Sequence, residues 1–569
     1  MKKYLSDISS AFLQSFWLHY ALWIFIITAL YSVLYAILIY TSQGGLFYVD
    51  SDCYTRALRI VDWLQNFNWQ EKIFPYTNYP DGFVLHFTRI CDVIWLFFAL
   101  PFMLFMPLKD AIFYGGFLFS PFFMALTLIT VLWGIKPYIE KIKDNKLFFF
   151  VIFVFSMLFC CKLSNIFDFY RPDHHCLMCF VFAFVIAAIL HSYNKKQNYA
   201  ELFFAGILTA CGLWASSAPE GLYIAGIALL ILTTDVIFSE YSAKNPLYYA
   251  TGFFCGNLTA WLLNPPFGGY AAMDNARLSI IHVVLSALIF ISFLIFNLLK
   301  LNNKSKKIFA LGGLAIISVL LMLMLFGTKT LFAPIYHETI LKFFIPAISE
   351  MAPIAYFLLP PVAAGMIIAS YLSFRQPYER FLSVMYFITA FPGMLVARFY
   401  PYYVVVWLVL YAYGLIALIK LKNSDVKYKA AIFAYLVWPI FYLALFTNEP
   451  DNTPDIKLNG VVLAETFEGP ELVWRYDVDT VASPYHTNIE GIRDNHISWF
   501  TTDENELKTL LEKRHVNYIT MHGVRESETY PDPQNNTDKL YGKVLTGKDI
   551  YPWMEKTDDR TYRVNYDKF

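Results

Sequence analysis

Long apolar runs recur along most of the chain, from about residue 12 to residue 447, with short polar stretches between them. A helix of about 20 apolar residues is long enough to cross the hydrocarbon core of a membrane. We therefore interpret each long run as a transmembrane helix. Thirteen runs of spanning length can be counted, near residues 12–41, 110–134, 147–164, 175–192, 200–215, 219–238, 247–264, 279–300, 307–327, 351–372, 381–397, 402–421 and 430–447.

One further apolar stretch, 92–108, is short and contains Pro101 and Pro107, so it could either cross the membrane or lie at its interface. The positions of Lys and Arg decide between the two, because basic loops gather on the cytoplasmic side. If 92–108 does not cross, the basic loops fall on the same side as the N-terminus. We therefore predict that it is an interfacial or re-entrant helix. The basic loops are 136–146, 194–197, 300–307, 375–380 and 420–429.

This topology divides the chain into two domains. Residues 1–447 form a multi-span membrane domain, whose first polar loop, 42–91, lies outside and carries interfacial helices. Residues 448–569, called the tail below, form a small external α/β domain. Its sequence predicts strands at 460–463 and 518–521, and a helix at 504–514 that opens after Thr502 and Asp503. The predicted fold class is thus mostly α, with about thirteen transmembrane helices and a small α/β tail.

The composition supports a membrane protein. Of the 569 residues, 57% are apolar and only 15% are charged, whereas soluble domains carry about 25% charged residues. Aromatic residues reach 19%, which suits the aromatic belts of membrane interfaces. The 44 basic and 44 acidic residues cancel, which excludes a global basic surface for nucleic acid. Cys53 and Cys91 flank the first polar loop, and a disulfide between them is possible.

The predicted outer loops carry acids and histidines beside the spans. Asp50 and Asp52, one residue apart, could share a divalent cation, since Mg²⁺ and Mn²⁺ prefer oxygen ligands. They could equally lie in a solvated loop next to Arg56 and Arg59. The stretch Arg171-Pro172-Asp173-His174-His175 directly precedes a span. It could bind a metal, or Asp173 could cap the helix with both histidines in water.

Other charged residues stand alone at span edges. Glu350 precedes a span, where it is either a ligand or a first-turn acid favoured by the helix dipole. Arg398 is either a snorkelling anchor or an anion clamp. His337 and Glu338 are weaker candidates in the loop that holds Glu350. For the lone acids we favour a structural role over a chemical one. These acids are Glu220 and Asp274.

Taken together, these residues resemble the catalytic subunit of oligosaccharyltransferases, which belong to the GT-C superfamily of membrane glycosyltransferases. The resemblance covers roughly residues 1–447 in plan. It implies thirteen spans, a first external loop with interfacial helices and an external C-terminal domain. The family's first external loop has Asp, then a small residue or Pro, then Tyr, and Asp52-Cys53-Tyr54 is similar. This implies that Asp52 binds the metal and contacts the acceptor, with Asp50 as a helper.

Three further motifs carry the resemblance. Archaeal members have Asp-His-His in the second external loop, which implies that Asp173 and His175 are metal ligands. The eukaryotic Ser-Val-Ser-Glu motif resembles residues 347–350 and implies that Glu350 is a ligand. The family's Arg-Phe pair at the outer end of a late span is similar to Arg398-Phe399. The implied catalytic residues are Asp52, Asp173 and Glu350, and the implied substrate-binding residues are Asp50, Arg56, Arg171 and Arg398.

The tail departs from this pattern. N-glycosylating members carry a Trp-Trp-Asp-Tyr-Gly motif that reads the acceptor Ser or Thr, and the comparable stretch here, 465–470, lacks it. The chain looks closer to a bacterial branch with an Asp-His-His loop and a tail stretch like residues 484–488. A lipid, a polysaccharide or a different protein motif therefore fits better as the acceptor than an Asn-x-Ser/Thr peptide.

The resemblance implies a glycosyltransferase of a bacterial inner (plasma) membrane with its tail on the periplasmic side. It would transfer a sugar or glycan from a polyprenyl phosphate or pyrophosphate, with Mn²⁺ or Mg²⁺ as cofactor. Two other classes stay open. A transporter or flippase of a lipid-linked glycan or other envelope component would place its charges near the membrane midplane. A non-catalytic scaffold would not need acids and histidines on one face.

Overall fold

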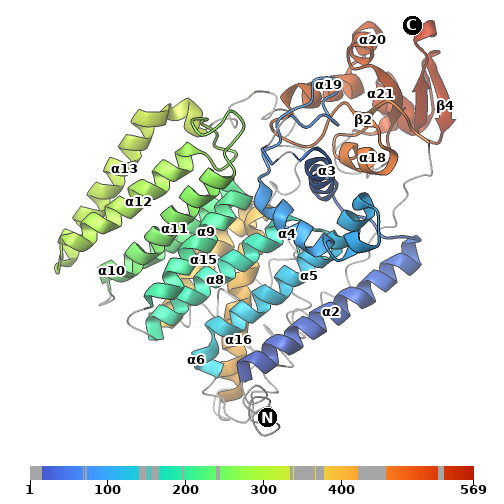
Figure 1. The fold of residues 1–569 in the computed structure, drawn as a ribbon. Helices are drawn as coiled ribbons and strands as arrows, with labels where there is room; N and C mark the ends of the chain where they lie inside the picture. Colours follow the sequence, from blue (N-terminus) through green and yellow to red (C-terminus); the bar gives the residue numbers. More distant parts are fainter. Residues whose placement is uncertain are drawn as a thin grey trace.

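The structure is a computed structural model, and most of the chain can be described in it. The described residues are 16–67, 69–70, 73–139, 150, 153–154, 166–194, 198–238, 244–332, 338, 342, 366, 377–420, 457–522 and 531–569. Within these ranges the chain is mostly helical, with one five-stranded sheet in the tail. The long helices lie side by side, and the tail packs at one end of them, opposite the end at which α6 (Lys136–Ile139) lies (Figure 1).

Ten of the predicted spans coincide with long helices. These are α2 (Phe16–Gln43), α5 (Leu108–Gly134), α8 (His174–Asn194), α9 (Tyr199–Ala215), α10 (Leu222–Phe238), α11 (Lys244–Leu263), α12 (Ile280–Leu298), α13 (Lys304–Phe332), α15 (Pro377–Leu395) and α16 (Tyr400–Lys420). In the part of the chain that the structure describes, seven helices are long and apolar enough to cross a membrane: α2, α5, α8, α10, α12, α13 and α16. The predicted runs 147–164, 351–372 and 430–447 fall almost wholly outside the described residues.

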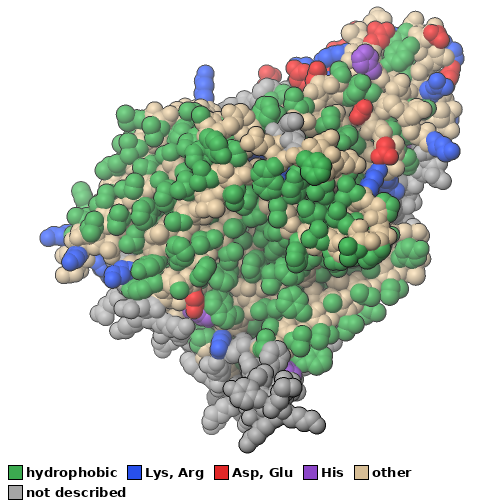
Figure 2. All heavy atoms as spheres, viewed as in Figure 1, with side chains coloured by type: hydrophobic (Ala, Val, Ile, Leu, Met, Phe, Trp, Pro, Cys, Tyr) green, Lys and Arg blue, Asp and Glu red, His purple; other side chains and the backbone are tan. Residues whose placement is uncertain are grey.

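The helices differ in how much of their surface they bury. Only 6% of the most apolar window of α13 is buried, against 89% of that of α16, so α13 lies at the edge of the helical layer and α16 lies inside it. Apolar side chains cover most of the visible helical surface (Figure 2), as expected where lipid is the solvent. Between α9 and α11, glycines allow close contact: a Cβ on Gly206 would lie 2.1 Å from the carbonyl oxygen of Tyr249.

The first polar loop holds helix α3 (Ser51–Asn66), and helix α4 (Arg89–Ala99) begins at the end of the loop and covers the first part of the stretch 92–108. With 11 residues, α4 is about 16 Å long, too short to cross a hydrocarbon core of about 30 Å. This agrees with the prediction that 92–108 does not cross, and its place at the interface stays a prediction. Cys53 and Cys91 are both buried free thiols, so the possible disulfide is not formed.

The tail is an α/β unit around one sheet of order β2-β1-β3-β5-β4. Its parallel half pairs β1 (Val461–Leu463) with β2 (Asp479–Thr480) and with β3 (Val516–Thr520). Its antiparallel half pairs β5 (Thr561–Val564) with β3 and with β4 (Met554–Asp558). Its helices are α18 (Gly469–Tyr476), α19 (Ile489–Phe500), α20 (Glu504–Lys513) and α21 (Leu540–Thr546).

The predicted elements of the tail are confirmed. The predicted strands coincide with β1 and β3, and the predicted helix coincides with α20. The carboxylate of Asp503 accepts hydrogen bonds from the backbone of Asn505 and Glu506 and so caps α20, as the sequence indicated.

The tail docks on the first polar loop. Thr77 pairs with Thr480 in an isolated bridge, and the backbone N–H of Tyr79 donates to the Thr480 carbonyl at 3.2 Å. Arg514, which is 1% exposed, donates to the side chain of Asn78 and to the carbonyl of Tyr79. Helix α18 of the tail also contacts α3 of the first polar loop. The tail and the loop therefore form a continuous structure over the ends of the long helices (Figure 1).

Candidate active site

The beginnings of several helices meet beneath the tail. Helix N-termini carry partial positive charge from their unpaired N–H groups, so a place where they converge favours carboxylates and phosphates. Five side chains come from these helix beginnings: Asp52 in the first turn of α3, His174 and His175 in the first turn of α8, Glu220 in the turn Ser217–Gly221 that opens α10, and Arg398 in the turn Ala397–Phe399 before α16.

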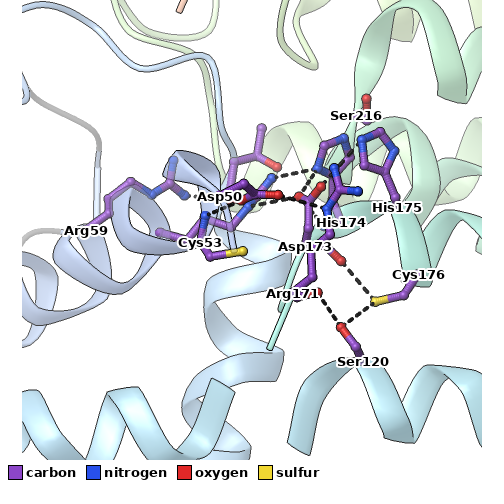
Figure 3. A network of polar contacts seen from close by, with 12 residues as sticks. Asp50, Cys53, Arg59, Ser120, Arg171, Asp173, His174, His175, Cys176 and Ser216 are labelled. Atoms are coloured by element: carbon purple, nitrogen blue, oxygen red, sulfur yellow. Dashed lines mark hydrogen bonds and ion pairs between the residues drawn. The ribbon is translucent and has the colours of Figure 1, made fainter. Parts of the chain in front are cut away.

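Asp173, His174 and His175 form the centre of the site. All three are buried. Each has one possible metal-ligand atom, and these three atoms lie within 4.8 Å of one another. The Nδ1 atom of His174 lies 2.5 Å from Oδ1 of Asp173, and Nε2 of His175 lies 3.4 Å from Oδ2 of the same carboxylate. The two imidazole rings are nearly stacked, with centroids 4.1 Å apart. Figure 3 shows these side chains facing one another at the start of α8.

Glu220 closes the group from the opposite side. Its side chain is fully buried, with Oε2 3.1 Å from Nε2 of His174 and Oε1 2.8 Å from Nδ1 of His175. Ser216 donates a hydrogen bond of 2.8 Å to Oε2, and Nη2 of Arg398 lies 3.7 Å from the same oxygen. Each carboxylate, Asp173 and Glu220, thus contacts both histidines.

Arg56 supplies a buried positive charge on the α3 side. Its Nη2 lies 3.1 Å from Nδ1 of His174, its Nε lies 3.7 Å from Asp173, and its guanidinium stacks over the Phe87 ring at 3.9 Å. Burial alone favours the neutral carboxyl group, but the two histidines and Arg56 outweigh it and hold the pKa of Asp173 well below its usual range.

Asp50 and Arg171 pair beside this centre. Asp50 caps α3 by accepting from the backbone N–H of Cys53 at 3.1 Å, and its other oxygen accepts from Nε of Arg171 at 2.8 Å. Ser120 in α5 donates to the Arg171 carbonyl. These contacts, drawn in Figure 3, join α3 and α5 to the stretch before α8. The pair Asp50–Arg171 therefore fixes the position of Asp52 relative to Asp173.

Asp52 completes the acidic side of the site. Burial, together with the carboxylates of Asp173 and Asp50, raises the pKa of Asp52 to about 6, which indicates that Asp52 lies within electrostatic reach of Asp173. The hydroxyl of Tyr485 in the tail lies beside Asp52 and Thr55, and burial followed by the Asp52 carboxylate raises the pKa of this hydroxyl. The first polar loop and the tail therefore both border the acidic centre.

The donor set fits a divalent cation. Three carboxylates, Asp52, Asp173 and Glu220, and the two histidines converge at this centre. Among the described residues, the buried Oδ2 atom of Asp173 accepts no hydrogen bond, and neither does Oε1 of Glu220. Buried carboxylate oxygens rarely lack a partner. Oxygen ligands suit Mg²⁺ and Mn²⁺, and imidazole nitrogens suit Mn²⁺ and the later transition metals better than Mg²⁺.

Comparison with known proteins finds similarity in structure but none in sequence families. No family model matches the sequence, and no curated protein matches it. Among solved structures, the archaeal oligosaccharyltransferase AglB from Archaeoglobus fulgidus, in complex with an inhibitory peptide and a dolichol-phosphate, is similar with a TM-score of 0.63 at 16% identity, over 92% of this chain and 71% of AglB. The apo form of the Archaeoglobus fulgidus enzyme gives 0.61 at 17% identity, over 94% and 72% of the two chains.

A third structure of the Archaeoglobus fulgidus oligosaccharyltransferase, in complex with Zn and sulfate, gives a TM-score of 0.54 at 15% identity, over 88% of this chain and 67% of the other. The chain has the fold of these oligosaccharyltransferase structures. The resemblance drawn from the motifs is therefore confirmed at the level of the fold, while the assignment to a bacterial branch stays a prediction.

This oligosaccharyltransferase-like fold brings some of the predicted site residues together but not all of them. Asp52, Arg56, Asp173, His175 and Arg398 gather at the helix beginnings described above. Asp50 and Arg171 are close by but engage each other. His337 and Glu350 lie outside the described residues, so their predicted roles stay predictions.

Two interpretations of single residues change. Arg59, placed in a solvated loop by one of the two alternatives for Asp50 and Asp52, is buried. It donates hydrogen bonds to Asp92 and to the carbonyls of Phe87 and Thr88, so it braces the loop. Glu220, interpreted as a lone structural acid, contacts both histidines. The alternative in which Asp173 only caps a helix and the histidines are solvated does not hold, because His174 and His175 are 4% and 6% exposed.

The tail segment 484–488 lies against the first polar loop close to Asp52. The ring of His486 lies 4.6 Å from that of His86, and the ring of Tyr485 lies 5.3 Å from that of Phe87. Burial lowers the pKa of His486 to about 4, so this imidazole is neutral at pH 7. A cavity of about 380 Å³ opens beside it, between Thr487 and the loop 273–276.

Proposed function

We propose that this protein is a membrane glycosyltransferase that transfers a sugar or glycan from a polyprenyl phosphate or pyrophosphate to an acceptor. The observation that carries the proposal is the buried group Asp173–His174–His175, set at converging helix N-termini on an oligosaccharyltransferase-like fold. That AglB is solved with a dolichol-phosphate, and the Archaeoglobus fulgidus enzyme with Zn and sulfate, supports a lipid-linked donor and a bound cation.

In this proposal Asp52, Asp173 and His175 hold the divalent cation, joined by Glu350 from outside the described residues. When bound, the cation neutralises charge on the departing phosphate as a Lewis acid. Mn²⁺ suits the histidine ligand better than Mg²⁺ does.

Arg56 and Arg398 would hold the donor phosphate. Their guanidinium groups approach the centre from α3 and from the turn before α16. Arginine presents several N–H donors in a planar fork that matches phosphate oxygens, and the helix N-termini add to the positive potential. The buried position of Arg56 strengthens these interactions because little water competes.

Transfer by direct displacement at the sugar needs no covalent enzyme intermediate. The thiols near the site support this route: burial raises the pKa of Cys91 to about 12 and that of Cys53 well above its usual value, so both stay protonated. In our proposal the Asp52 carboxylate orients the nucleophilic group of the acceptor, and the tail segment 484–488 forms the opposite wall of the acceptor site.

A transporter or flippase would use the same kind of helical frame but would place charged residues midway along its spans. Here the charges of the site lie at the beginnings of α3, α8 and α10, directly beneath the tail. This placement favours a reaction at a membrane surface over passage through the membrane. We further propose that this surface is the periplasmic one and that the membrane is a bacterial plasma membrane.

Mass spectrometry of lipid-linked and surface glycans tests the proposal. Deleting the gene, or replacing it with the Asp173→Ala variant, should make polyprenyl-linked glycan accumulate and one surface glycan disappear. Asp235→Asn is the matched control, because Asp235 is also in the membrane domain but pairs with Tyr193 away from the site. Identical glycan profiles in wild-type and Asp173→Ala cells would contradict the proposal.

A further inference from the structure

Glu220 is in contact with both histidines, although nothing in the sequence around it suggests a metal site. Its side chain is fully buried, and the turn Ser217–Gly221 places it where α10 begins. A buried carboxylate is costly unless charged or hydrogen-bonded partners surround it. The partners here are His174, His175, Ser216 and Arg398.

The contacts of His175 assign different roles to its two ring nitrogens. Its Nδ1 lies 2.8 Å from Oε1 of Glu220, and an ionised carboxylate only accepts, so Nδ1 carries the proton. In neutral imidazole the other nitrogen then carries the lone pair that can bind a metal. That nitrogen, Nε2, faces Oδ2 of Asp173 at 3.4 Å.

The 3.4 Å separation is longer than a good hydrogen bond but matches two ligands of one ion. Atoms that each lie about 2.1 Å from a metal are roughly 3.0 Å apart at a right angle and roughly 3.4 Å apart at the tetrahedral angle. The 2.8 Å contact between Nδ1 of His175 and Oε1 of Glu220 is instead the length of a close imidazole–carboxylate ion pair. The ring therefore has a metal-facing side toward Asp173 and a carboxylate-facing side toward Glu220.

His174 lies between the same two carboxylates. Its Nδ1 lies 2.5 Å from Oδ1 of Asp173 and 3.1 Å from Nη2 of Arg56. Its Nε2 lies 3.1 Å from Oε2 of Glu220. Glu220 thus contacts one nitrogen of each ring, and the other nitrogen of each ring faces Asp173.

We propose that Glu220 is a positioning residue, which holds the rings of both histidines in place so that Nε2 of His175 faces a divalent cation beside Asp173. This inference rests on the proposed function, because it assumes that the cation binds there. A carboxylate behind a metal-binding histidine typically contributes 10- to 100-fold to metal affinity. The partner here comes from a different helix, which ties the start of α10 to the metal-binding stretch before α8.

Mn²⁺ binding to the purified full-length protein in detergent tests this role. Electron paramagnetic resonance counts free Mn²⁺ in a titration, and spin-echo modulation detects histidine nitrogen bound to the ion. We expect Glu220→Gln to weaken Mn²⁺ binding 10- to 100-fold while the nitrogen modulation of the bound ion remains. Glu201→Gln is the matched control, since Glu201 pairs at 2.8 Å with His191 away from the site, and it should bind Mn²⁺ as the wild type does.

The outcomes separate this inference from the proposed function. If Asp173→Ala abolishes Mn²⁺ binding but Glu220→Gln has wild-type affinity, the positioning role is wrong and the proposed cation site stands. Wild-type protein that binds no Mn²⁺ would overturn both the cation site and the positioning role. If Glu220→Gln does not fold, Ser216→Ala decides, because it removes only the hydrogen bond to Oε2: a several-fold loss of affinity supports the role, and unchanged affinity contradicts it.

Discussion

Replacing Asp494 with Asn should loosen the tail from the first polar loop. The Oδ2 atom of Asp494 accepts from Lys513 at 2.6 Å and from both Nε and Nη2 of Arg514, at 3.0 and 2.7 Å. Arg514 in turn reaches across to Asn78 and Tyr79. An amide at position 494 would present an N–H group or a weaker acceptor to the three cations around it, Arg493, Lys513 and Arg514. The buried Arg514 guanidinium would keep only the more distant carboxylate of Asp81, at 3.9 Å.

The size of the effect follows from burial. Asp494 is 2% exposed and Arg514 is 1% exposed, and removing one partner of a buried ion pair costs about 3–5 kcal/mol. Arg514 keeps its contacts to the loop, so we expect the lower end, about 3 kcal/mol. At about 1.4 kcal/mol per power of ten, docking should become roughly 100-fold less favourable.

Hydrogen exchange measured by mass spectrometry on the full-length protein reads this change directly. The N–H groups of Tyr79 and Thr480 are reporters, because each donates across the junction between loop and tail, at 3.2 and 3.0 Å. In Asp494→Asn both should exchange roughly 100-fold faster, whereas the exposed control Asp559→Asn should leave them unchanged. Unchanged reporters would refute the reasoning. So would equal acceleration throughout the tail, which would mean that the tail unfolds.

Four further predictions follow from the same structure. Hydrogen bonds from Lys513 and Arg514 outweigh burial and hold the pKa of Asp494 below its ordinary value. The stabilising effect of the Asp494 carboxylate is therefore complete above about pH 4 and is lost as the pH falls through the lower pKa of the folded state. The difference in hydrogen exchange between Asp494→Asn and the wild type should vanish in that acidic range. Arg398→Lys should raise the KM for the lipid-linked donor about 10-fold with less effect on kcat, measured by steady-state kinetics. A fluorescent Asn-x-Ser/Thr peptide should not be glycosylated, and transfer to it that disappears in Asp52→Ala would contradict this. Cysteine labelling from outside should reach position 500 and not position 140, and the reverse pattern would overturn the predicted topology.

The sequence predicted the helical frame well because membrane spans depend on a local property, the length of an apolar run. The runs at 175–192 and 402–421, for instance, match α8 and α16. The core of the candidate site was also visible, since Asp173, His174 and His175 are contiguous. The stretch 92–108 could be predicted not to cross the membrane only because the positions of Lys and Arg in other loops constrained the topology.

The rest of the site depends on tertiary packing. Glu220 lies 46 positions from His174, and only the packing of α10 against α8 brings the two together, so an isolated acid at a span edge gave no signal. Arg59 looked equivalent to Arg56 because both belong to α3, yet Arg59 faces Asp92, which the sequence did not mark as its partner. In both cases the deciding information was the identity of a distant partner.

Reconstituted glycan transfer tests the central claim most directly. Purified full-length protein would be supplied with a polyprenyl-linked glycan donor extracted from cells that lack the gene, a cell-envelope extract as acceptor, and Mn²⁺, and the products would be followed by mass spectrometry. The account predicts that the glycan moves from the lipid to an acceptor, that free polyprenyl phosphate or pyrophosphate appears, and that Asp173→Ala abolishes both while Asp235→Asn does not. A protein that moves the intact lipid-linked glycan across vesicle membranes without breaking the sugar–phosphate bond would contradict it.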